Sequence, residues 1–501
     1  MLSKLFLFHF VFWTTLLTLI FVANIRAAET RSTNNRYNIL FIAVDDLRPE
    51  LGCYGADHIR SPNIDRLSAA GRRFSHHYVQ VPTCGASRYA LLTGRRASES
   101  NGYSNYSFSQ GKSALKQEIS ENGAQTFPEL FRRSGYHTAM IGKISHQPDG
   151  RVYNYNGTGD GLPELPNAWD ELLTPYGSWK YSWATFFAYA DGYSRESTTG
   201  TQKNPLLYRN LLYQNPDVSD QELPDGMMAD QAIKTLNRLT GSEKPFFLAV
   251  GFYKPHLPFV SPKKYWDMYE NIEIPLPPKE KPETVYGHKS GEFFRYQASF
   301  PKQVPLSPSD TKNVKRAYAA CVSYVDAQIG RVLDTLKKSG KDRQTIVVLW
   351  GDHGWHLGEH QVWGKQTPLE PALRSPLIIS VPDMNQPGVA TEALVESVDI
   401  FPTLVDLCQP SYRKTQYQQG GQSFTAVLND PGLNGKESAF GYVGANVQTL
   451  RTPEYRLIVR KNAENRFTNI ELYDHRNDPG ETKNIAPQQV DQVEQLLEKL
   501  K

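Results

Sequence analysis

The sequence predicts an α/β fold, with a large domain built on a mostly parallel central sheet flanked by helices and a smaller C-terminal α+β domain. Short, continuous apolar runs alternate with helical patterns along most of the chain, which is typical of parallel strands buried on both faces. After about residue 411 the runs become shorter and more polar. These two textures predict a large domain at residues 28–410 and a smaller one at 411–501.

Four apolar runs are each followed within a few residues by groups that bind metal or move protons. The runs are residues 39–44, 138–141, 246–250 and 346–350. They lead, in order, to Asp45 and Asp46, to Lys143 and His146, to His256, and to Asp352 and His353. In open parallel sheets the ligand crevice lies outside the carboxyl ends of the strands. We therefore expect these residues, distant in the sequence, to form one site.

A long helical pattern separates the third and fourth runs. Apolar residues recur at helical spacing over residues 314–336 and include Cys321, which we interpret as a core residue. Ser309 or Asp310 is the expected N-cap, and Gly340 follows the basic end of the helix. Such a helix fits the crossover that parallel strands require. Residues 398–407 form a second amphipathic stretch that we expect to close the large domain.

Three further segments complete the predicted organisation. Residues 151–225 are rich in Tyr, Gly, Pro and Asn without clear periodicity, which predicts an insertion of loops near the site. Its aromatic residues are a candidate sugar platform, although burial is the commoner reason for such residues: Tyr176, Trp179, Tyr181, Trp183 and Tyr189. Beyond a Gln- and Gly-rich link, residues 455–459 predict a strand and residues 490–500 a final helix.

Composition excludes several classes of protein. The chain has 501 residues, of which 39% are hydrophobic and 12% aromatic, enough for a packed interior. Its formal net charge of +3 comes from nearly balanced acids and bases, so we expect no nucleic acid partner, and any attraction for an anion must be local. Four cysteines are too few for a disulfide scaffold.

The first residues resemble an export signal. Lys4 precedes an apolar run at residues 5–22, and small residues including Ala27 follow it. This order predicts a signal peptide at residues 1–27 and a secreted or periplasmic protein, with no stable membrane insertion after cleavage. The alternative is an uncleaved membrane anchor.

Cys84 lies in a polar segment that suits a turn into a helix. Its neighbours include Thr83, Gly85, Ser87 and Arg88. A helix N-terminus and an arginine both favour an anion. On residue chemistry alone, Cys84 could be a small buried hydrophobe, a thiolate nucleophile or part of an anion pocket.

Residues 84–94, which read CGASRYALLTG, resemble the signature C-x-(P/A)-S-R-x-x-x-L-T-G of the type I sulfatases. Other landmarks occur in that family's order, namely Asp45-Asp46, Gly142-Lys143, Lys254-Pro255-His256, Gly351-Asp352-His353-Gly354 and Glu471-Leu472-Tyr473-Asp474. The motifs look most like those of iduronate-2-sulfatases and related bacterial polysaccharide sulfatases. The resemblance implies an alkaline-phosphatase-like fold and conversion of Cys84 to formylglycine (3-oxoalanine), an aldehyde that hydrates to a gem-diol. Ala86 stands where most members have Pro, which leaves open which maturation system accepts the segment.

The resemblance also implies roles for the strand-end residues. Around Cys84, one divalent cation, usually Ca²⁺ with Mg²⁺ as an option, would be held by Asp45, Asp46, Asp352 and His353, the first three offering hard carboxylate oxygens. Imidazole is a poor calcium ligand, so for His353 hydrogen bonding stays open beside coordination. Arg88, Lys143 and Lys365 would hold the sulfate oxygens. His256 would protonate the departing sugar oxygen, and His146 would remove the remaining hydroxyl proton.

The function expected from these residues is hydrolysis of sulfate esters on a sulfated oligo- or polysaccharide, either a glycosaminoglycan or an algal polysaccharide such as ulvan. A formylglycine-generating enzyme is the expected maturation partner. Two alternatives remain. A phosphomonoesterase or phosphodiesterase of the same superfamily would normally use Ser or Thr and a two-zinc site rich in histidine, and a non-catalytic carbohydrate-binding relative would never mature.

Overall fold

The computed structural model describes residues 36–196, 211–278, 288, 290–296 and 306–500. The chain divides into two units, Met1–Tyr37 and Asn38–Lys501, and the fold below is that of the second. The predicted signal peptide at residues 1–27 lies outside the described residues. Within those residues, every helix is too short or too polar to cross a membrane.

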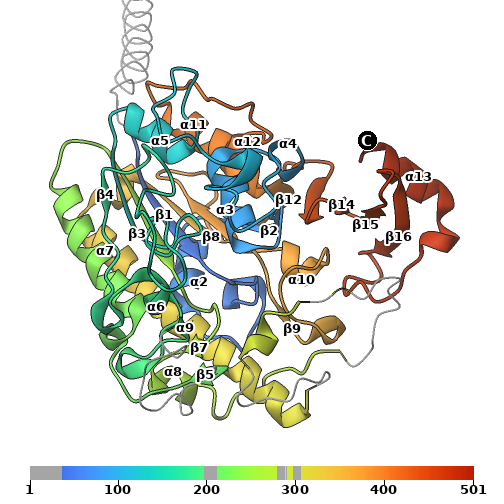
Figure 1. The fold of residues 1–501 in the computed structure, drawn as a ribbon, viewed down its shortest axis with the longest axis horizontal. Coiled ribbons are helices and arrows are strands. Elements are labelled where there is room, and N and C mark those ends of the chain that lie inside the picture. Colours follow the sequence, from blue (N-terminus) through green and yellow to red (C-terminus); the bar gives the residue numbers. More distant parts are fainter. Residues whose placement is uncertain (1–35, 197–210, 279–287, 289, 297–305, 501) are drawn as a thin grey trace, which may run out of the picture. The chain divides into compact units, whose positions relative to one another are not determined.

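The core of the protein is an eight-stranded sheet with the order β12-β2-β11-β8-β1-β6-β3-β4 (Figure 1). Its middle contains the four predicted strands, β8 (Thr345–Gly351), β1 (Asn38–Val44), β6 (Phe246–Phe252) and β3 (His137–Gly142). These four run parallel to one another, and every residue of β1, β6 and β8 is buried. Burial on both faces explains why their sequences are continuous apolar runs rather than alternating ones.

The outer strands make the sheet mixed. β11 (Leu377–Ser380) runs antiparallel to both β8 and β2 (Arg72–Tyr78), whereas β12 (Thr391–Glu396) and the short β4 (Glu171–Leu172) pair in parallel. β2 reads RRFSHHY and offers no apolar run, which is why the sequence pattern does not reveal it. The predicted mostly parallel sheet is confirmed, with one antiparallel strand.

Helices cover both faces of the sheet (Figure 1). On one side α9 (Pro308–Lys338) packs against α2 (Pro62–Ala69), α7 (Pro224–Thr240) and α8 (Lys263–Asp267). On the other side α3 (Cys84–Thr93) contacts α5 (Phe127–Arg133) and α11 (Ile400–Cys408), which confirms the helix expected near residues 398–407.

The long helix α9 begins earlier than predicted. Ser307, not Ser309 or Asp310, is the N-cap, and its Oγ accepts from the backbone N–H of Asp310 at 3.1 Å. Pro308 takes the first helical position, where its fixed φ suits a helix and its missing N–H costs nothing. Cys321 is fully buried within this helix, as expected of a core residue.

The C-terminal part forms a four-stranded antiparallel sheet. Its strands are β13 (Ala439–Val443), β14 (Val447–Arg451), β15 (Tyr455–Lys461) and β16 (Phe467–Asp474), covered by α13 (Val490–Glu498). The predicted strand and final helix are therefore confirmed, whereas the domain boundary after residue 410 stays a prediction. The remaining short elements are α4 (Ala97–Ser100), α6 (Ser182–Phe186), α10 (Glu370–Leu373), α12 (Thr425–Asn429), β5 (Tyr213–Gln214), β7 (Phe259–Val260), β9 (His356–Leu357) and β10 (Trp363–Gly364).

Candidate active site

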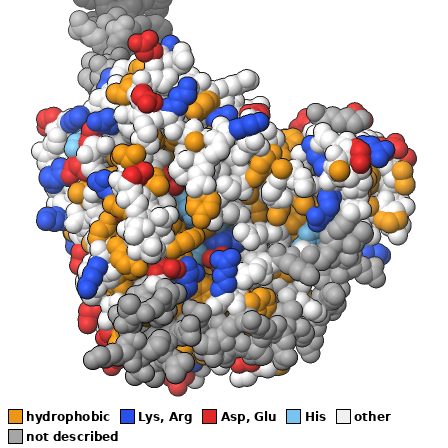
Figure 2. Space-filling view, viewed as in Figure 1, with side chains coloured by type: hydrophobic (Ala, Val, Ile, Leu, Met, Phe, Trp, Pro, Cys, Tyr) orange, Lys and Arg blue, Asp and Glu red, His pale blue; other side chains and the backbone are white. Residues whose placement is uncertain are grey.

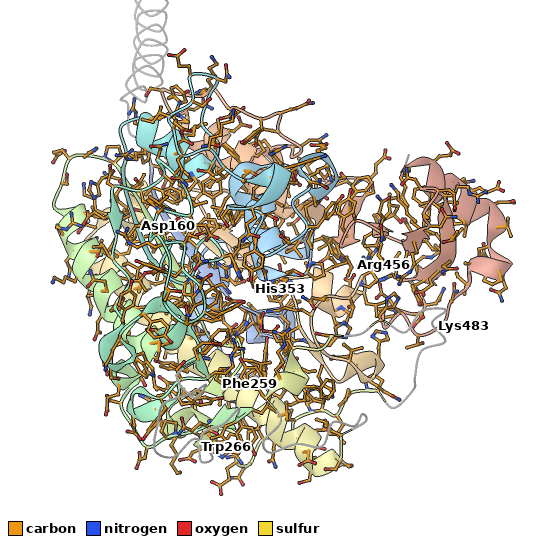
Figure 3. The ribbon with its side chains drawn as sticks, viewed as in Figure 1. Asp160, Phe259, Trp266, His353, Arg456 and Lys483 are labelled. Atoms are coloured by element: carbon orange, nitrogen blue, oxygen red, sulfur yellow. The ribbon has the colours of Figure 1, made fainter. Side chains whose placement is uncertain are left out.

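The carboxyl ends of β1 and β8 bring the predicted aspartates together. The backbone N–H of Asp46 donates to Oδ1 of Asp352 at 2.9 Å, although 306 residues separate them. Figure 3 labels the neighbouring His353 near the middle of the molecule, where these strands end. Asp45, Asp46 and Asp352 are all fully buried. The structure thus brings the ends of β1 and β8 together, as expected from the sequence.

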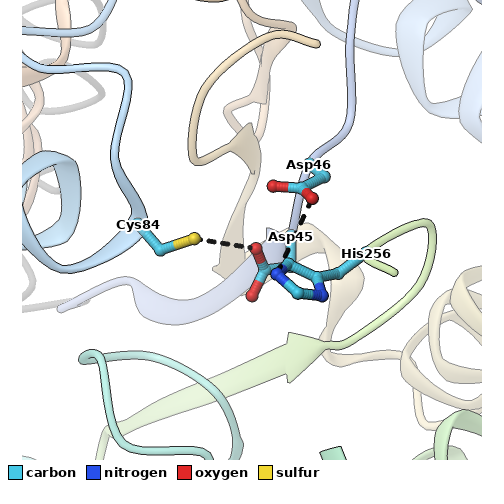
Figure 4. Close-up of side chains that lie close together, drawn as sticks. All are labelled: Asp45, Asp46, Cys84 and His256. Carbon is cyan, nitrogen blue, oxygen red and sulfur yellow. Dashed lines mark hydrogen bonds and ion pairs between the residues drawn. The ribbon is translucent and has the colours of Figure 1, made fainter. Parts of the chain in front are cut away.

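Cys84 is the first residue of α3, and its side chain points into this cluster (Figure 4). Its Sγ lies 3.4 Å from Oδ1 of Asp45, 3.3 Å from Nε2 of His353 and 3.1 Å from Nζ of Lys365. Burial raises the pKa of the Cys84 thiol to about 12, and the nearby Asp45 carboxylate adds to the rise. The unmodified side chain is therefore a protonated thiol at neutral pH, and thiols react chiefly as thiolates.

Asp45 is surrounded by cations. Lys143 forms an ion pair with its Oδ2, and Arg88 lies 3.5 Å from the same oxygen and 3.0 Å from Oδ2 of Asp352. Burial raises the pKa of Asp45, but the Lys143 ammonium and the Arg88 guanidinium outweigh it and hold that pKa well below its ordinary value. Arg88 also donates to the carbonyls of Lys143 and Ile144, so one guanidinium ties three strand ends together.

Asp46 has fewer cationic neighbours than Asp45. Nζ of Lys365 lies 2.7 Å from its Oδ1, and Nε2 of His353 lies 3.4 Å from the same atom. Burial raises the pKa of Asp46 well above its ordinary value, and Lys365 and His353 offset only part of that rise. Nδ1 of His353 faces the carbonyl oxygen of Gly354 at 2.9 Å, which can only accept a hydrogen bond. The neutral ring therefore carries its proton on Nδ1 and turns the lone pair of Nε2 toward the cluster.

His256 follows β6, and hydrogen bonds from Lys254 fix the backbone of its loop. Nζ of Lys254 donates to the carbonyls of His256 at 2.9 Å and Pro258 at 2.6 Å, which fixes the loop of the Lys254-Pro255-His256 motif. Nε2 of His256 lies 3.8 Å from Oδ2 of Asp46 and 3.2 Å from Oε1 of Glu292. Burial and the Lys365 ammonium lower the pKa of His256 to about 4, although Glu292 opposes them.

His146 follows β3 and is buried without hydrogen bonds. Among the described residues, neither of its ring nitrogens has a hydrogen-bond partner. Its ring instead contacts the rings of Tyr106 and Trp183, with centroid distances of 6.3 and 5.4 Å. Burial, reinforced by Lys143, lowers the pKa of His146 well below its ordinary value. A neutral imidazole with two unused nitrogens is suited to accept a proton.

A pocket of about 190 Å³ leads from the surface to Cys84. In Figure 2, Lys and Arg side chains gather around a hollow near the place where Figure 3 labels His353. The floor of the pocket contains Lys143, His146, His256 and Lys365. Its walls are partly aromatic, with contributions from Tyr155, Trp183, Phe186 and Phe187. The predicted insertion at residues 151–225 therefore does border the site.

The aromatic platform expected from sequence is only partly realised. Trp183 lines the pocket, whereas Trp179 and Tyr189 are buried in the core and Tyr176 donates from its hydroxyl to Asp149. Trp183 also donates from Nε1 to Oε1 of Gln147 at 3.0 Å, which fixes its ring beside His146. Burial is thus the role of most aromatic residues in this segment, and Trp183 itself is only 2% exposed, so the sugar platform stays a prediction.

Some polar residues of the pocket carry no sequence signal. They include Asn105, which accepts from the backbone N–H of Gly85 at 2.9 Å, and Arg195, Glu292 and Arg295, which come from segments without a motif. Loop residues reach a site through tertiary packing alone, so neither periodicity nor spacing reveals them.

The cluster fits a divalent cation. Ligand atoms of Asp45, Cys84, Asp352 and His353 lie within 4.8 Å of one another, and so do those of Asp45, Asp46, Cys84 and His256. Oδ2 of Asp46 is buried without a hydrogen bond among the described residues, whereas Oδ2 of Asp45 is paired with Lys143. Such carboxylate oxygens are hard ligands suited to Ca²⁺ or Mg²⁺.

Charge is closely matched around the cluster. Arg88 and Lys143 contact Asp45, Arg88 also contacts Asp352, and Lys365 contacts Asp46 and Glu292. A divalent cation would add positive charge beside the aspartates, where an anionic substrate would bind.

Comparisons with known proteins agree with this site. A family model described as Sulfatase matches residues 37–410, and one described as N-sulphoglucosamine sulphohydrolase, C-terminal, matches residues 358–501. The chain is 33% identical over 419 residues to a Mus musculus protein named iduronate 2-sulfatase, covering 76% of this chain and 70% of that one. It is 30% identical over 456 residues to a Formosa agariphila protein named sulfatase, covering 90% and 83%.

The fold also resembles solved structures. A phosphonate monoester hydrolase from Silicibacter pomeroyi superposes with a TM-score of 0.70 at 21% identity, over 93% of this chain and 94% of that one. At that identity the likeness concerns the fold, and it confirms the alkaline-phosphatase-like architecture expected from sequence.

Proposed function

The chain belongs to the sulfatase family and is a sulfuric ester hydrolase, and we propose that it removes sulfate from a sulfated carbohydrate through formylglycine made from Cys84. The observation that carries this proposal is the position of Cys84. Its Sγ lies at the floor of the pocket, within 3.4 Å of Lys365, His353 and Asp45. An aldehyde at this place, once hydrated, would put a hydroxyl group where the sulfur is, among the groups that a sulfate ester needs.

The three bases divide the task of holding sulfate. Arg88 and Lys143 approach from the side of Asp45, and Lys365 approaches from the side of Asp46. Their fixed N–H groups would stabilise the negative charge that develops on the sulfate oxygens. Because aspartates already hold all three bases in place, little reorganisation is needed when the ester binds.

The two histidines divide the proton transfers. A hydroxyl oxygen of the hydrated aldehyde would attack sulfur as its proton passes to the neighbouring carboxylate of Asp45, 3.4 Å from Sγ of Cys84. As the bond from sulfur to the sugar oxygen breaks, His256 in its protonated form would give the proton on Nε2 to that oxygen. His146 would then accept the proton of the second hydroxyl, so that the carbonyl reforms and sulfate departs. The unpartnered nitrogens of His146 support this second role.

Asp45, Asp46, Asp352 and His353 would hold one divalent cation, which we propose is Ca²⁺. When bound, the ion would supply a Lewis acid beside the sulfate and the residue at position 84. Its support here is the close grouping of ligand atoms from Asp45, Cys84, Asp352 and His353, and the Asp46 oxygen that accepts no hydrogen bond among the described residues.

The proposed substrate is a sulfated sugar unit of a glycosaminoglycan or of an algal polysaccharide such as ulvan. The mouse relative is named for iduronate, a sugar acid. A pocket with polar groups on its floor and Trp183 on its wall suits a ring that presents hydroxyl groups and an apolar face. We further propose that residues 1–27 direct export to the periplasm or the medium, and that a formylglycine-generating enzyme of the host accepts Ala86.

The decisive experiment compares aryl sulfate with aryl phosphate and with a panel of defined sulfated oligosaccharides, using protein from the native host. We expect hydrolysis of the sulfates, with Cys84→Ala inactive as the blank. Mass spectrometry of the Cys84 peptide should show the aldehyde. A strong preference for phosphate would favour a phosphoesterase, and an unmodified Cys84 in an inactive native protein would favour a carbohydrate-binding relative.

A further inference from the structure

Glu292 joins two residues of the site that come from different parts of the chain. Its Oε1 lies 3.2 Å from Nε2 of His256, and its Oε2 lies 3.2 Å from Nζ of Lys365. The carboxylate is thus a bridge between the proposed proton donor and one of the bases proposed to hold sulfate. Burial raises the pKa of Glu292, but Lys365 and His256 outweigh it and hold that pKa well below its ordinary value, so the group is ionised.

Packing fixes this bridge. Glu292 precedes a short turn, Phe293–Arg295, and Phe293 stacks on Trp363 with ring centroids 5.2 Å apart. Trp363 belongs to β10, the strand that leads directly to Lys365. On the other side of this contact, a Cβ at Gly364 would lie 2.4 Å from Oγ of Ser290, so only glycine permits the close approach. The segment that carries Glu292 is therefore packed directly against the one that carries Lys365.

The hydrogen bonds of His256 show which of its ring nitrogens faces Glu292. Nδ1 lies 2.6 Å from the carbonyl oxygen of Leu257, an acceptor, so this nitrogen carries a proton and Nε2 is the atom that faces the pocket. A carboxylate can only accept, so the contact with Glu292 is a hydrogen bond when Nε2 also carries a proton. Glu292 consequently favours the ring orientation in which Nε2 of His256 faces the pocket.

We infer that Glu292 is a positioning residue for sulfate ester hydrolysis, which holds Nε2 of His256 toward the leaving oxygen. The inference rests on the proposed function. It has a specific consequence, because leaving groups differ in their need for a proton. A sugar alkoxide is strongly basic and must be protonated as it departs, whereas a nitrophenolate departs without help. Loss of Glu292 should therefore slow sugar sulfates far more than aryl sulfates.

The test uses the isosteric Glu292→Gln in the mature protein, with kcat and KM measured on a sulfated sugar and on 4-nitrophenyl sulfate. We expect kcat on the sugar sulfate to fall roughly 10- to 100-fold, the scale of a misplaced general acid, and kcat on the aryl sulfate to fall less than about 3-fold. Glu292→Asp, which keeps a carboxylate on a shorter side chain, should recover part of the loss. Asp267→Asn removes an exposed carboxylate paired with Lys263 and is the control for charge alone.

Equal losses on both substrates would mean that Glu292 only supports the fold, and no loss on either would mean that it has no role. Either result overturns the inference. If Glu292→Gln does not fold, the same ratio is taken from Glu292→Asp, and an unchanged ratio there also overturns it. Absence of sulfatase activity in the wild-type protein would instead overturn the proposed function, and with it this inference.

Discussion

Nζ of Lys365 lies 2.7 Å from Oδ1 of Asp46, whereas the other oxygen of the same carboxylate has no hydrogen-bond partner among the described residues. Nε2 of His256 lies 3.8 Å from that second oxygen, too far for a hydrogen bond. Asp46 also has a backbone φ of 59°, in the left-handed region that aspartate and asparagine tolerate best after glycine. One carboxylate thus has a satisfied side and an open side, both fixed by an unusual backbone.

The open oxygen of Asp46 predicts the effect of Asp46→Asn. The amide keeps an oxygen for Lys365, accepts the left-handed backbone and removes a buried charge, so the variant should fold. It should lose the stabilisation that Ca²⁺ gives the wild-type protein, which at about 100 times the dissociation constant amounts to about 2.7 kcal/mol. Thermal unfolding with added CaCl₂ and with EDTA measures both effects.

The same cation site can be tested in the wild-type protein by removing the metal with a chelator. EDTA should lower Tm and activity of the wild-type protein, and added Ca²⁺ should restore both. The same Ca²⁺-dependent rise of Tm in wild type and Asp46→Asn would show that Asp46 is not a ligand. If Mg²⁺ but not Ca²⁺ restored Tm and activity, the proposed metal site would stand and the proposed ion would be Mg²⁺.

The sequence anticipates this cluster because the strands are buried and parallel. Continuous apolar runs in the sequence identify β1, β3, β6 and β8 as buried strands. Because the carboxyl ends of neighbouring parallel strands meet at one edge of the sheet, the grouping of Asp45, Asp46, Asp352 and His256 follows from the topology. The positions of the polar strand β2 and the antiparallel strand β11 could not be predicted in this way, because they depend on tertiary pairing. The position of Glu292 could not be predicted either, because its contacts with His256 and Lys365 depend on the stacking of Phe293 on Trp363.

His146→Gln should separate the two halves of the reaction. The ring nitrogens of His146 have no hydrogen-bond partner among the described residues, so the substitution breaks no hydrogen bond there. If His146 accepts the second hydroxyl proton, the first turnover should remain and sulfate release should slow roughly 10²- to 10⁴-fold. Rapid-mix kinetics with 4-nitrophenyl sulfate should then show a burst of nitrophenol close to one per active site.

His256→Ala is the matched control, because it removes the other histidine of the pair. That variant should slow the first turnover of a sugar sulfate and show no burst. A His146→Gln enzyme that lacks a burst and is slow in its first turnover would assign His146 to the attack on sulfur instead.

Glu164 predicts a pH dependence of stability. Its Oε2 accepts from the backbone N–H of Gln147 at 2.6 Å, and burial raises its pKa from 4.5 to about 7. Because the folded state then holds a proton that the unfolded state has released, stability falls as pH rises from 4.5 to about 7. Glu164→Gln lacks that proton, so its stability relative to wild type should rise by about 3 kcal/mol over the same interval.

Urea unfolding at pH 5 and pH 8 measures the effect. The exposed Glu118→Gln controls for the loss of a carboxylate elsewhere on the chain and should show no comparable change. A difference between Glu164→Gln and wild type that stays constant between the two pH values would contradict the assignment.

Arg456 of β15, labelled in Figure 3, links the C-terminal sheet to α10, which follows the loop that carries Lys365. Its guanidinium forms ion pairs with Glu370 of α10 and with Glu481, and it donates to Oγ1 of Thr449 at 3.2 Å. The backbone N–H of Glu370 also donates to Oε2 of Glu481 at 2.7 Å. Arg456 is 1% exposed, so Arg456→Met would leave two carboxylates with less compensation in a buried place.

Breaking one partner of such a buried network costs about 3–5 kcal/mol, because the remaining charges stay out of water. Arg456→Met should therefore lower the free energy of unfolding by that amount at pH 7, and the triple variant with Glu370→Gln and Glu481→Gln should recover much of it.

The same network predicts a pH dependence. Burial raises the pKa of Glu481, but Arg456 and His475 outweigh burial and lower that pKa from 4.5 to about 2. The network therefore contributes to the free energy of unfolding above pH 4.5, and this contribution is lost as pH falls toward 2. The difference between wild type and Arg456→Met in urea unfolding should shrink over that interval, and a difference that persists unchanged at low pH would show that Arg456 acts through packing rather than charge.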